Sequence, residues 1–317
     1  MTALEQRAPA TPPAPARPPS DHDRDRRARR WSERGWALFF LGPQLVGLVV
    51  FVVGPLLFAM GLSLTKWDGL SEPTFVGLDN FARQLTDETF LVSLRNTLFF
   101  TVLLVPGELT CALLVALALH TVRGRVLYRL FYFAPVVTSS VAVSVVWLWL
   151  LNGEFGPINA YLRNIGLDPP NWLVDTRTVI PAIALVSIWR GLGFTMVIFL
   201  AGLQAVPKEY VEAATVDGAG PVRRFWHVTL PMLSPTILFL AIMSFIGSFQ
   251  VFDIAFTMTR GGPGDASYTL VYDIYDLAFT QFRFGDSAAV AVVLFAILLA
   301  ITLVQLRMQR RFVHYEE

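Results

Sequence analysis

The sequence predicts an all-α integral membrane protein with six transmembrane helices. Hydrophobic residues make up 54% of the 317 residues and charged residues only 15%, with a mean hydropathy of +0.54, a balance that water-soluble domains rarely show. Six stretches are long and almost free of charge, and about 20 apolar residues suffice for a helix to cross the ~30 Å hydrocarbon layer. Basic residues gather in alternate connections between these stretches, as they do on the cytoplasmic side of membrane proteins.

The first 33 residues differ in composition from the rest of the chain. They are rich in Ala, Pro and Arg and contain the basic run DRDRRARR. Such a segment has too little apolar surface to offset the entropy lost on ordering, so we expect a disordered, basic cytoplasmic leader. The apolar run that follows is longer than the core of a secretory signal, and we expect it to remain attached as the first span.

The six spans are expected within residues 34–312. In chain order they cover residues 36–64, 96–119, 126–151, 179–205, 231–258 and 287–306. The first and the last contain no ionisable side chain, and Arg129 lies near the start of the third. Glu108, Arg190 and Asp253 lie inside the second, fourth and fifth spans.

The orientation follows from the distribution of Lys and Arg. With the amino terminus inside, 17 of the 25 basic residues fall in cytoplasmic segments, counting Arg129 at the inner end of its span. Seven fall in the three outward loops. Because cytoplasmic segments retain basic residues, we expect both termini, including the tail 313–317, in the cytoplasm. The net charge of +1 averages over this asymmetry and indicates no nucleic-acid partner.

The three ionisable residues inside the spans should avoid lipid. A charged side chain at that depth costs several kcal/mol or more, so each is expected to face the bundle, a cavity or a partner chain. Glu108 or Asp253 could pair with Arg190 or contact a second membrane chain. The Arg190 guanidinium carries five donors and could bind sugar hydroxyls or an anionic group such as phosphate.

The connection 206–230, between the fourth and fifth spans, is too polar to enter lipid and is patterned like a helix–turn–helix. Its first half has Glu209 and Glu212 near the positive end of a helix dipole, followed by strong helix formers. Gly218 can adopt positive φ and end that helix, and Pro221 suits the first turn of a second. Such a unit could dock in a groove on another protein, and the alternative is a helix lying on the lipid surface.

This connection carries a family resemblance. Glu212, Ala213 and Ala214, then Gly218, then Val228-Thr229-Leu230-Pro231 resemble the EAA loop of ABC importer permeases, with Val228 where Ile is usual. The stretches FVGLDNF, RNT, GPINAYL, LAGLQAVPKEYVEAATVDGA and TRGGPGDAS are similar to the carbohydrate-uptake branch, the maltose and glycerol-phosphate type permeases. The resemblance covers residues 36–312.

The resemblance implies a type I importer (MetI-like) fold in a bacterial cell membrane. It implies a permease subunit that forms the path for a sugar, whether a monosaccharide, an oligosaccharide or a related solute. The implied partners are a second homologous permease subunit, a cytoplasmic ATPase dimer and an extracytoplasmic solute-binding protein. The residues implied in coupling to the ATPase are Glu209, Tyr210, Glu212, Ala213, Ala214, Asp217, Gly218 and Ala219.

By resemblance to the maltose-type permeases, the substrate path takes residues from the fourth and fifth spans. They are Ser187, Arg190, Gly191, Phe194, Ser244, Ser248 and Gln250. Aromatic faces, hydroxyls and amides are the groups that sugars require. Because Arg190 and Phe194 differ from the maltose pattern, maltose itself is not the expected solute.

We expect no enzyme activity, cofactor or metal in this chain. A phosphate-binding P-loop needs a Gly-Lys pair, and the only lysines, Lys66 and Lys208, do not follow glycine, so ATP hydrolysis is expected in a partner. The four His are scattered, and the single Cys111 excludes an internal disulfide. Gly262–Asp265 matches the Gly-x-Gly-Asp of intramembrane aspartyl proteases, but it falls in a polar loop and not in a span.

The alternative function is a secondary transporter driven by an ion gradient. Glu108 and Asp253 could serve as its intramembrane carboxylates. That interpretation gives no role to the EAA-like connection.

Overall fold

The computed structural model describes residues 36, 39–120, 122 and 125–312. The predicted leader, 1–33, and tail, 313–317, lie outside the described residues. The chain divides into two units, Met1–Phe58 and Ala59–Glu317. A helix runs Phe39–Leu62, and within it the π-helical turn η1 (Val49–Val53) precedes α2 (Gly54–Leu62). Pro55 has no amide proton to donate to the preceding turn. The π-helical turn widens the helix there, which lets the carbonyls of that turn find other partners.

A short hairpin follows that helix. Strands β1 (Thr65–Lys66) and β2 (Thr74–Phe75) are antiparallel, with Thr65 opposite Phe75, and α3 (Asp79–Thr86) comes next. The side-chain amide of Asn80 donates to the carbonyls of Ser63 and Thr65, both at 2.8 Å. These two bonds fix the start of α3 against the hairpin.

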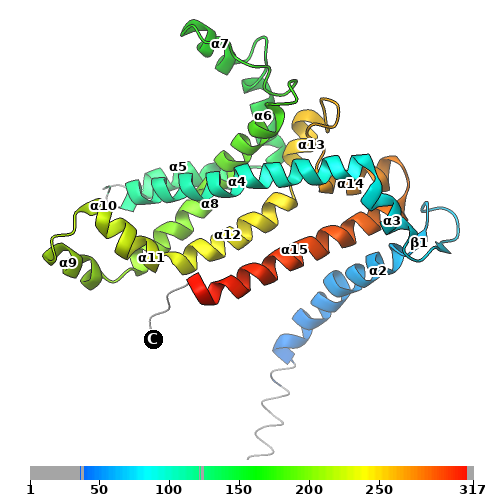
Figure 1. The fold of residues 1–317 in the computed structure, drawn as a ribbon, viewed down its shortest axis with the longest axis horizontal. Helices are drawn as coiled ribbons and strands as arrows, with labels where there is room; N and C mark the ends of the chain where they lie inside the picture. The colour runs from blue at the N-terminus through cyan, green and yellow to red at the C-terminus, as the bar shows by residue number, and fades with distance from the viewer. Residues whose placement is uncertain (1–35, 37–38, 121, 123–124, 313–317) are drawn as a thin grey trace, which may run out of the picture. The chain divides into compact units, whose positions relative to one another are not determined.

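Two long helices, α4 (Glu88–His120) and α8 (Val179–Ala205), pack along each other and form the centre of the second unit (Figure 1). Helix α8 has the bounds of the predicted fourth span, whereas α4 begins eight residues before the predicted second span. The Asp87 carboxylate explains that earlier start, because it accepts bonds from the amides of Thr89 and Phe90, which have no partner inside the helix.

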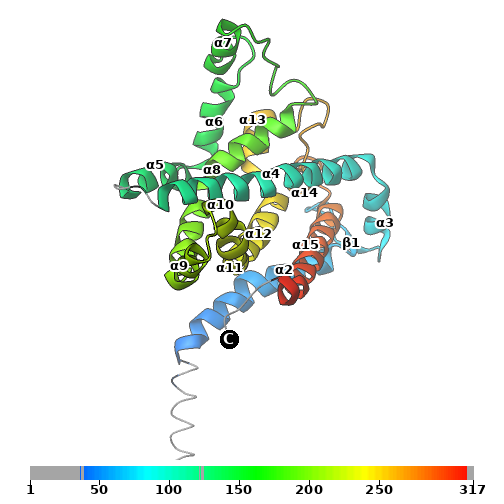
Figure 2. The same cartoon turned by 60° about the vertical axis from the view of Figure 1, so that its left-hand side comes forward.

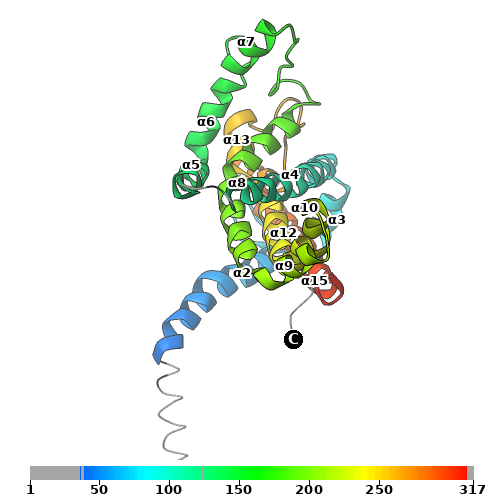
Figure 3. The ribbon, with the colours of Figure 1, turned by 90° about the vertical axis from the view of Figure 1, so that its left-hand side faces the viewer.

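The third predicted span is bent. Helix α5 (Arg125–Val137) and helix α6 (Ser140–Leu150) meet at 98°, and α6 leads to α7 (Pro157–Asn164). Figures 2 and 3 show α6 rising steeply from α5. Pro135 lies in the last turn of α5, where its ring and missing amide weaken the helix just before the bend.

The predicted connection 206–230 contains the expected helix–turn–helix. Helix α9 (Lys208–Val216) is followed by α10 (Pro221–Arg224), then the π-helical turn η2 (Phe225–Thr229) and α11 (Leu230–Met232). Helix α12 (Ser234–Phe249) turns away from that segment by 65°. In Figure 1, α9 and α10 lie at the opposite end of α4 from α3 and β1.

The predicted fifth span, 231–258, is not one helix. Helix α12 ends at Phe249, and α13 (Asp253–Thr259) starts after a break at residues 250–252. The Thr269 hydroxyl donates to the Val251 carbonyl, so the break does not leave that carbonyl unpaired. Helix α14 (Leu270–Tyr275), the π-helical turn η3 (Asp276–Thr280) and α15 (Phe284–Phe312) complete the described chain.

Three clusters of buried apolar residues hold the second unit together. One joins α4, α6, α8 and α13, a second joins α4, α8 and α12, and a third joins α12, α14 and α15 to the start of α4. Among the described residues, four helices are long and apolar enough to cross a membrane, and counting each bent pair as one span gives six. Six is the number that the sequence predicts.

Candidate functional site

The EAA-like connection, residues 206–230, forms an exposed helix–turn–helix, which we call the knob. Helix α9 ends in a Schellman motif, in which the amide of Gly218 donates to the Thr215 carbonyl and that of Ala219 to the Ala214 carbonyl. Gly218 has φ of +78°, and no atom lies within 4 Å of where its Cβ would be. The prediction that Gly218 ends the helix at positive φ is therefore confirmed.

A side-chain bond braces the two helices of this knob. Arg224 Nη1 donates to Thr215 Oγ1 at 2.6 Å, which ties α10 to the last turn of α9. The predicted coupling residues lie on α9 and its turn, and Tyr210 is 52% exposed. Glu209, Glu212, Ala213, Asp217 and Gly218 are also exposed, whereas Ala214 and Ala219 are half-buried. The knob therefore offers acidic, aromatic and small residues to a partner.

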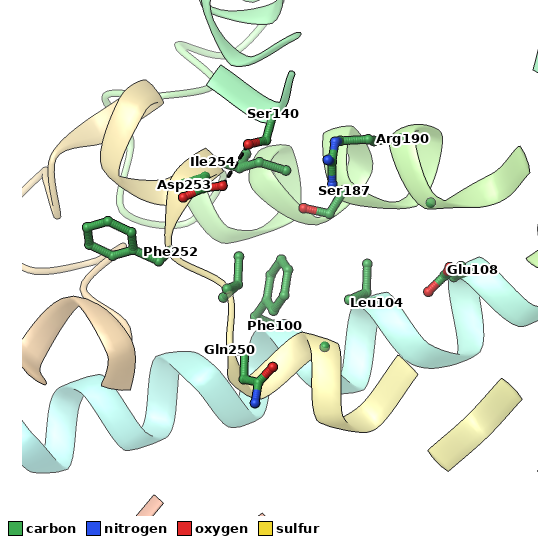
Figure 4. Close-up of a pocket in the computed structure, with 13 residues that line it drawn as sticks. Phe100, Leu104, Glu108, Ser140, Ser187, Arg190, Gln250, Phe252, Asp253 and Ile254 are labelled. Atoms are coloured by element: carbon green, nitrogen blue, oxygen red, sulfur yellow. Dashed lines mark hydrogen bonds between the residues drawn. The ribbon is translucent and has the colours of Figure 1, made fainter. Parts of the chain in front are cut away.

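A cavity of about 270 Å³ lies where the start of α6, after the α5–α6 bend, and the 250–252 break meet α4 and α8. Figure 4 shows residues of α4, α6, α8 and the 250–252 break around it. Four of the seven predicted substrate-path residues line it, and these are Ser187, Arg190, Gly191 and Gln250.

Glu108 of α4 lines the cavity and joins three helices. Its Oε1 accepts a bond from Thr195 Oγ1 of α8 and its Oε2 one from Ser244 Oγ of α12, both at 2.7 Å. A Cβ on Gly191 would lie 2.7 Å from Oε1, so glycine at that position lets the carboxylate lie against α8. Glu108 thus bonds with two hydroxyls, and the pairing with Arg190 that the sequence allowed is not formed among the described residues.

The other intramembrane charges also face the cavity. Asp253 Oδ2 accepts a bond of 2.6 Å from Ser140 Oγ, between the first residues of α13 and α6. In Figure 4 the Arg190 guanidinium lies beside Ser187. Its buried Nε has no hydrogen-bond partner within the described part of the chain. The cavity is therefore lined by a guanidinium and a carboxylate acceptor.

The remaining predicted path residues lie elsewhere. Ser244 contacts Glu108 and does not itself line the cavity. Ser248 is fully buried and accepts a bond from Thr101 Oγ1 at 2.9 Å. Phe194 is 45% exposed and does not line the cavity.

Four polar residues that line this cavity or bond to its lining were not among the substrate-path residues expected from the sequence. They are Glu108, Ser140, Thr195 and Asp253. Both carboxylates could be singled out as charges within apolar runs, but the hydroxyls gave no comparable signal because Ser and Thr are frequent in membrane helices. No group of three or more His, Cys, Asp or Glu able to hold a metal occurs within the described ranges.

Comparison with known proteins decides the family. Residues 108–314 match the family described as the inner membrane component of binding-protein-dependent transport systems. The chain belongs to this family. It is a multi-pass permease subunit of an ABC importer, as the resemblance in the sequence implied.

The permease is similar over nearly its whole length to curated relatives. It is 36% identical over 281 residues to the sn-glycerol-3-phosphate transport system permease protein UgpA of Agrobacterium fabrum, covering 87% of this chain and 94% of the relative. It is 36% identical over 299 residues to the probable ABC transporter permease protein YesP of Bacillus subtilis, covering 92% and 96%.

A solved structure shares the fold. A chain of a bacterial ABC transporter involved in the import of the acidic polysaccharide alginate superposes with a TM-score of 0.78 at 25% identity, covering 90% of this permease and all of that chain. The six-span, MetI-like fold class predicted from the sequence is thereby confirmed.

Proposed function

We propose that this permease forms the translocation path for a sugar or sugar-related solute and couples to a separate ATPase through residues 206–230. The observation that carries the proposal is the cavity at the two helix breaks, where Arg190 and Asp253 face the same space. Each sugar hydroxyl can donate one hydrogen bond and accept others. A site lined by both a guanidinium and a carboxylate therefore suits a polyhydroxy solute better than a purely anionic one.

The named relatives support this substrate class. One is a permease for glycerol 3-phosphate and a solved neighbour belongs to an importer of alginate, so both carry hydroxyl-rich, acidic solutes. A phosphate or carboxylate on the sugar could bind the Arg190 guanidinium, whose planar donors match such groups. Sugars that carry an anionic group are thus the second candidate class.

The braced knob supports ATPase coupling. Most of the nine residues of helix α9 are exposed, and its Schellman turn and the Arg224–Thr215 bond make it a rigid unit. In the proposed mechanism, ATP-driven closure of two ATPase subunits moves this knob, the cavity opens outward, and hydrolysis resets it. In this arrangement both termini and the knob are cytoplasmic, and the solute-binding protein lies on the other side of the membrane. A second homologous permease subunit completes the path.

Co-purification tests the coupling. The tagged permease is purified from detergent as wild type, Glu212→Lys and Gly218→Asp, with Glu154→Lys in an outward loop as the charge-matched control. We expect wild type and the control to retain an ATPase and a second membrane chain, and the two knob variants to lose the ATPase alone. Equal recovery of the ATPase from all four proteins would contradict the coupling role.

Uptake of Arg190 variants tests the path. We expect Arg190→Ala to lower uptake at least tenfold while the ATPase still co-purifies. Arg190→Lys keeps the charge and loses the planar fork, so it should restore part of the uptake only if the solute carries an anionic group. Loss of the ATPase from Arg190→Ala would instead assign Arg190 a structural role.

The ion-gradient alternative is distinguished in the same preparation. A wild-type permease that purifies without partners yet accumulates solute under a proton or sodium gradient would replace the ABC mechanism. The two engaged oxygens of Glu108 argue against that outcome, because a carrier carboxylate must exchange its proton or ion during each cycle.

A further inference from the structure

Six aromatic side chains form a continuous row between the 250–252 break and the hairpin. Ring centroids lie 5.1 Å apart for Phe252 and Tyr275, 5.3 Å for Tyr275 and Phe279, and 6.3 Å for Phe279 and Phe284. The row ends at Trp67, 5.4 Å from Phe284. Phe256 widens it at the other end, at 5.1 Å from Phe252 and 5.4 Å from Tyr275.

The residues at the two ends of this row line two different cavities. Phe252 lines the cavity that contains Arg190 and Asp253. Trp67 lines a second cavity of about 500 Å³, between the hairpin, α3 and the start of α15. The row therefore links a polar cavity at the helix breaks to one at the end of the second unit that carries α3 and β1, opposite the knob (Figure 1).

The rings of the row are not needed to fill the core. Tyr268 and Tyr272 are buried, at 7% and 9% exposure, and their ring centroids are 4.6 Å apart. Tyr272 packs against Phe252 and Phe256 of the row. Phe252, Phe256, Tyr275 and Phe284 are half-buried, and Phe279 is 63% exposed. The row thus keeps ring surface exposed in front of a buried aromatic layer.

The second cavity has rigidly held polar groups. Asp286 is 7% exposed, and its two oxygens accept bonds from Arg83 Nε at 3.1 Å and Arg283 Nε at 2.9 Å. Asp68 and Glu72 of the hairpin also line this cavity. Aromatic surface beside fixed donors and acceptors is the combination that binds a ring with one apolar face and several hydroxyls.

We propose that the row and the second cavity form a sugar-binding route that receives pyranose rings outside and leads them to the inner cavity. This inference rests on the proposed function. The C–H faces of the sugar stack on one ring after another, and its hydroxyls exchange water for the polar groups at either end. Contact with many equivalent rings keeps each binding step weak, which allows the sugar to move on.

The test uses the assembled importer in lipid nanodiscs and saturation-transfer NMR with four probes. These are the methyl glycosides of α-D-glucose, α-D-galactose and α-D-mannose, and methyl α-D-glucuronide. The variants are Phe279→Leu, Phe279→Tyr and the control Phe155→Leu, which removes a ring of similar exposure, 68%, before α7. We expect at least one probe to receive saturation, with a loss of fivefold or more in Phe279→Leu and less than twofold in the other two.

Three outcomes would overturn the proposal. One is absence of saturation transfer to all four probes in wild type. A second is equal transfer in Phe279→Leu and Phe155→Leu. The third is loss of the second membrane chain from Phe279→Leu alone, which would identify the row as a subunit interface. Failure of the proposed function would appear in a different measurement, as absence of an ATPase from the wild-type preparation. The two results are independent because saturation transfer to the probes does not require ATP.

Discussion

Ser140 and Asp253 are 113 positions apart in the chain and are joined by a hydrogen bond of 2.6 Å. Each is the first residue of the second helix at a bend or break, α6 after α5 and α13 after α12. The bond therefore fixes the two breaks relative to each other beside the cavity. A path that must open alternately on two sides needs such a defined contact between the elements that line it.

Breaking this bond should affect transport more than stability. We expect Ser140→Ala to lower uptake three- to tenfold, because α6 and α13 lose their alignment at the cavity. The pair is solvent-accessible, so unfolding stability should change by less than about 1 kcal/mol. Ser139→Ala is the matched control, since the Ser139 side chain makes no capping hydrogen bond to α6. Equal uptake by the two variants would argue against the alignment role.

The clamp at Glu108 should contribute to stability. Removing the Thr195 or Ser244 hydroxyl leaves one carboxylate oxygen without its donor, and we expect Thr195→Val and Ser244→Ala each to cost about 1–3 kcal/mol. Thermal unfolding of the purified permease measures this cost. In a Glu108→Gln background both losses should shrink, because the coupling runs through the carboxylate. Fully additive losses would show that the hydroxyls stabilise the bundle by other contacts.

Substitutions at Gly218 can distinguish the effect of backbone strain from that of a steric clash. Because the space around its Cβ position is open, an uncharged substitution there acts only through φ of +78°. We expect Gly218→Asn, which tolerates this region, to keep the ATPase, and Gly218→Val to lose most of it, since the left-handed conformation costs about 1–2 kcal/mol or more for such residues. The amount of ATPase co-purified per permease measures the difference. Retention by both variants would mean that the turn need not be fixed for docking.

The sequence predicted the elements whose signals are local. The bounds of α8, Val179–Ala205, follow from an apolar run in which Arg190 is the one charged residue, and the turn at Gly218 follows from a helix former, a glycine and a proline within nine residues. The family resemblance rested on that segment and on other short local stretches such as FVGLDNF and TRGGPGDAS. Such features need no knowledge of what the chain packs against.

The break at 250–252 and the partners of Glu108 could not be predicted in this way. No proline interrupts the run at the break, which is stabilised by Thr269, 18 residues away, and by Ser140, 113 residues away. The two hydroxyls that bind Glu108 are 87 and 136 residues from it. Which of many Ser and Thr residues meets a buried carboxylate is decided by tertiary packing, and the sequence alone does not state it.

Asp273 of α14 is a buried carboxyl outside the predicted spans. It is 2% exposed, and its Oδ2 has no hydrogen-bond partner among the described residues. Burial, and then the nearby carboxylates Asp87 and Asp276, raise the pKa of Asp273 to about 7, and Arg283 opposes this shift. The group is therefore neutral below pH 7 in the folded permease.

This raised pKa predicts a pH-dependent stability. A carboxyl with a folded pKa above its unfolded value of about 3.9 stabilises the fold fully below pH 3.9, and that contribution is lost as pH rises to about 7. We expect Asp273→Asn to match wild type near pH 4 and to have a higher Tm at pH 8, by about 2–4 °C for each kcal/mol relieved. Asp68→Asn is the control, because hydrogen bonds from Ser71 hold the pKa of Asp68 at about 2 and its removal should leave the profile from pH 5 to 8 unchanged. If Asp273→Asn lowers the Tm at pH 8, the ionised carboxylate has a partner that stabilises it, and the neutral assignment is wrong.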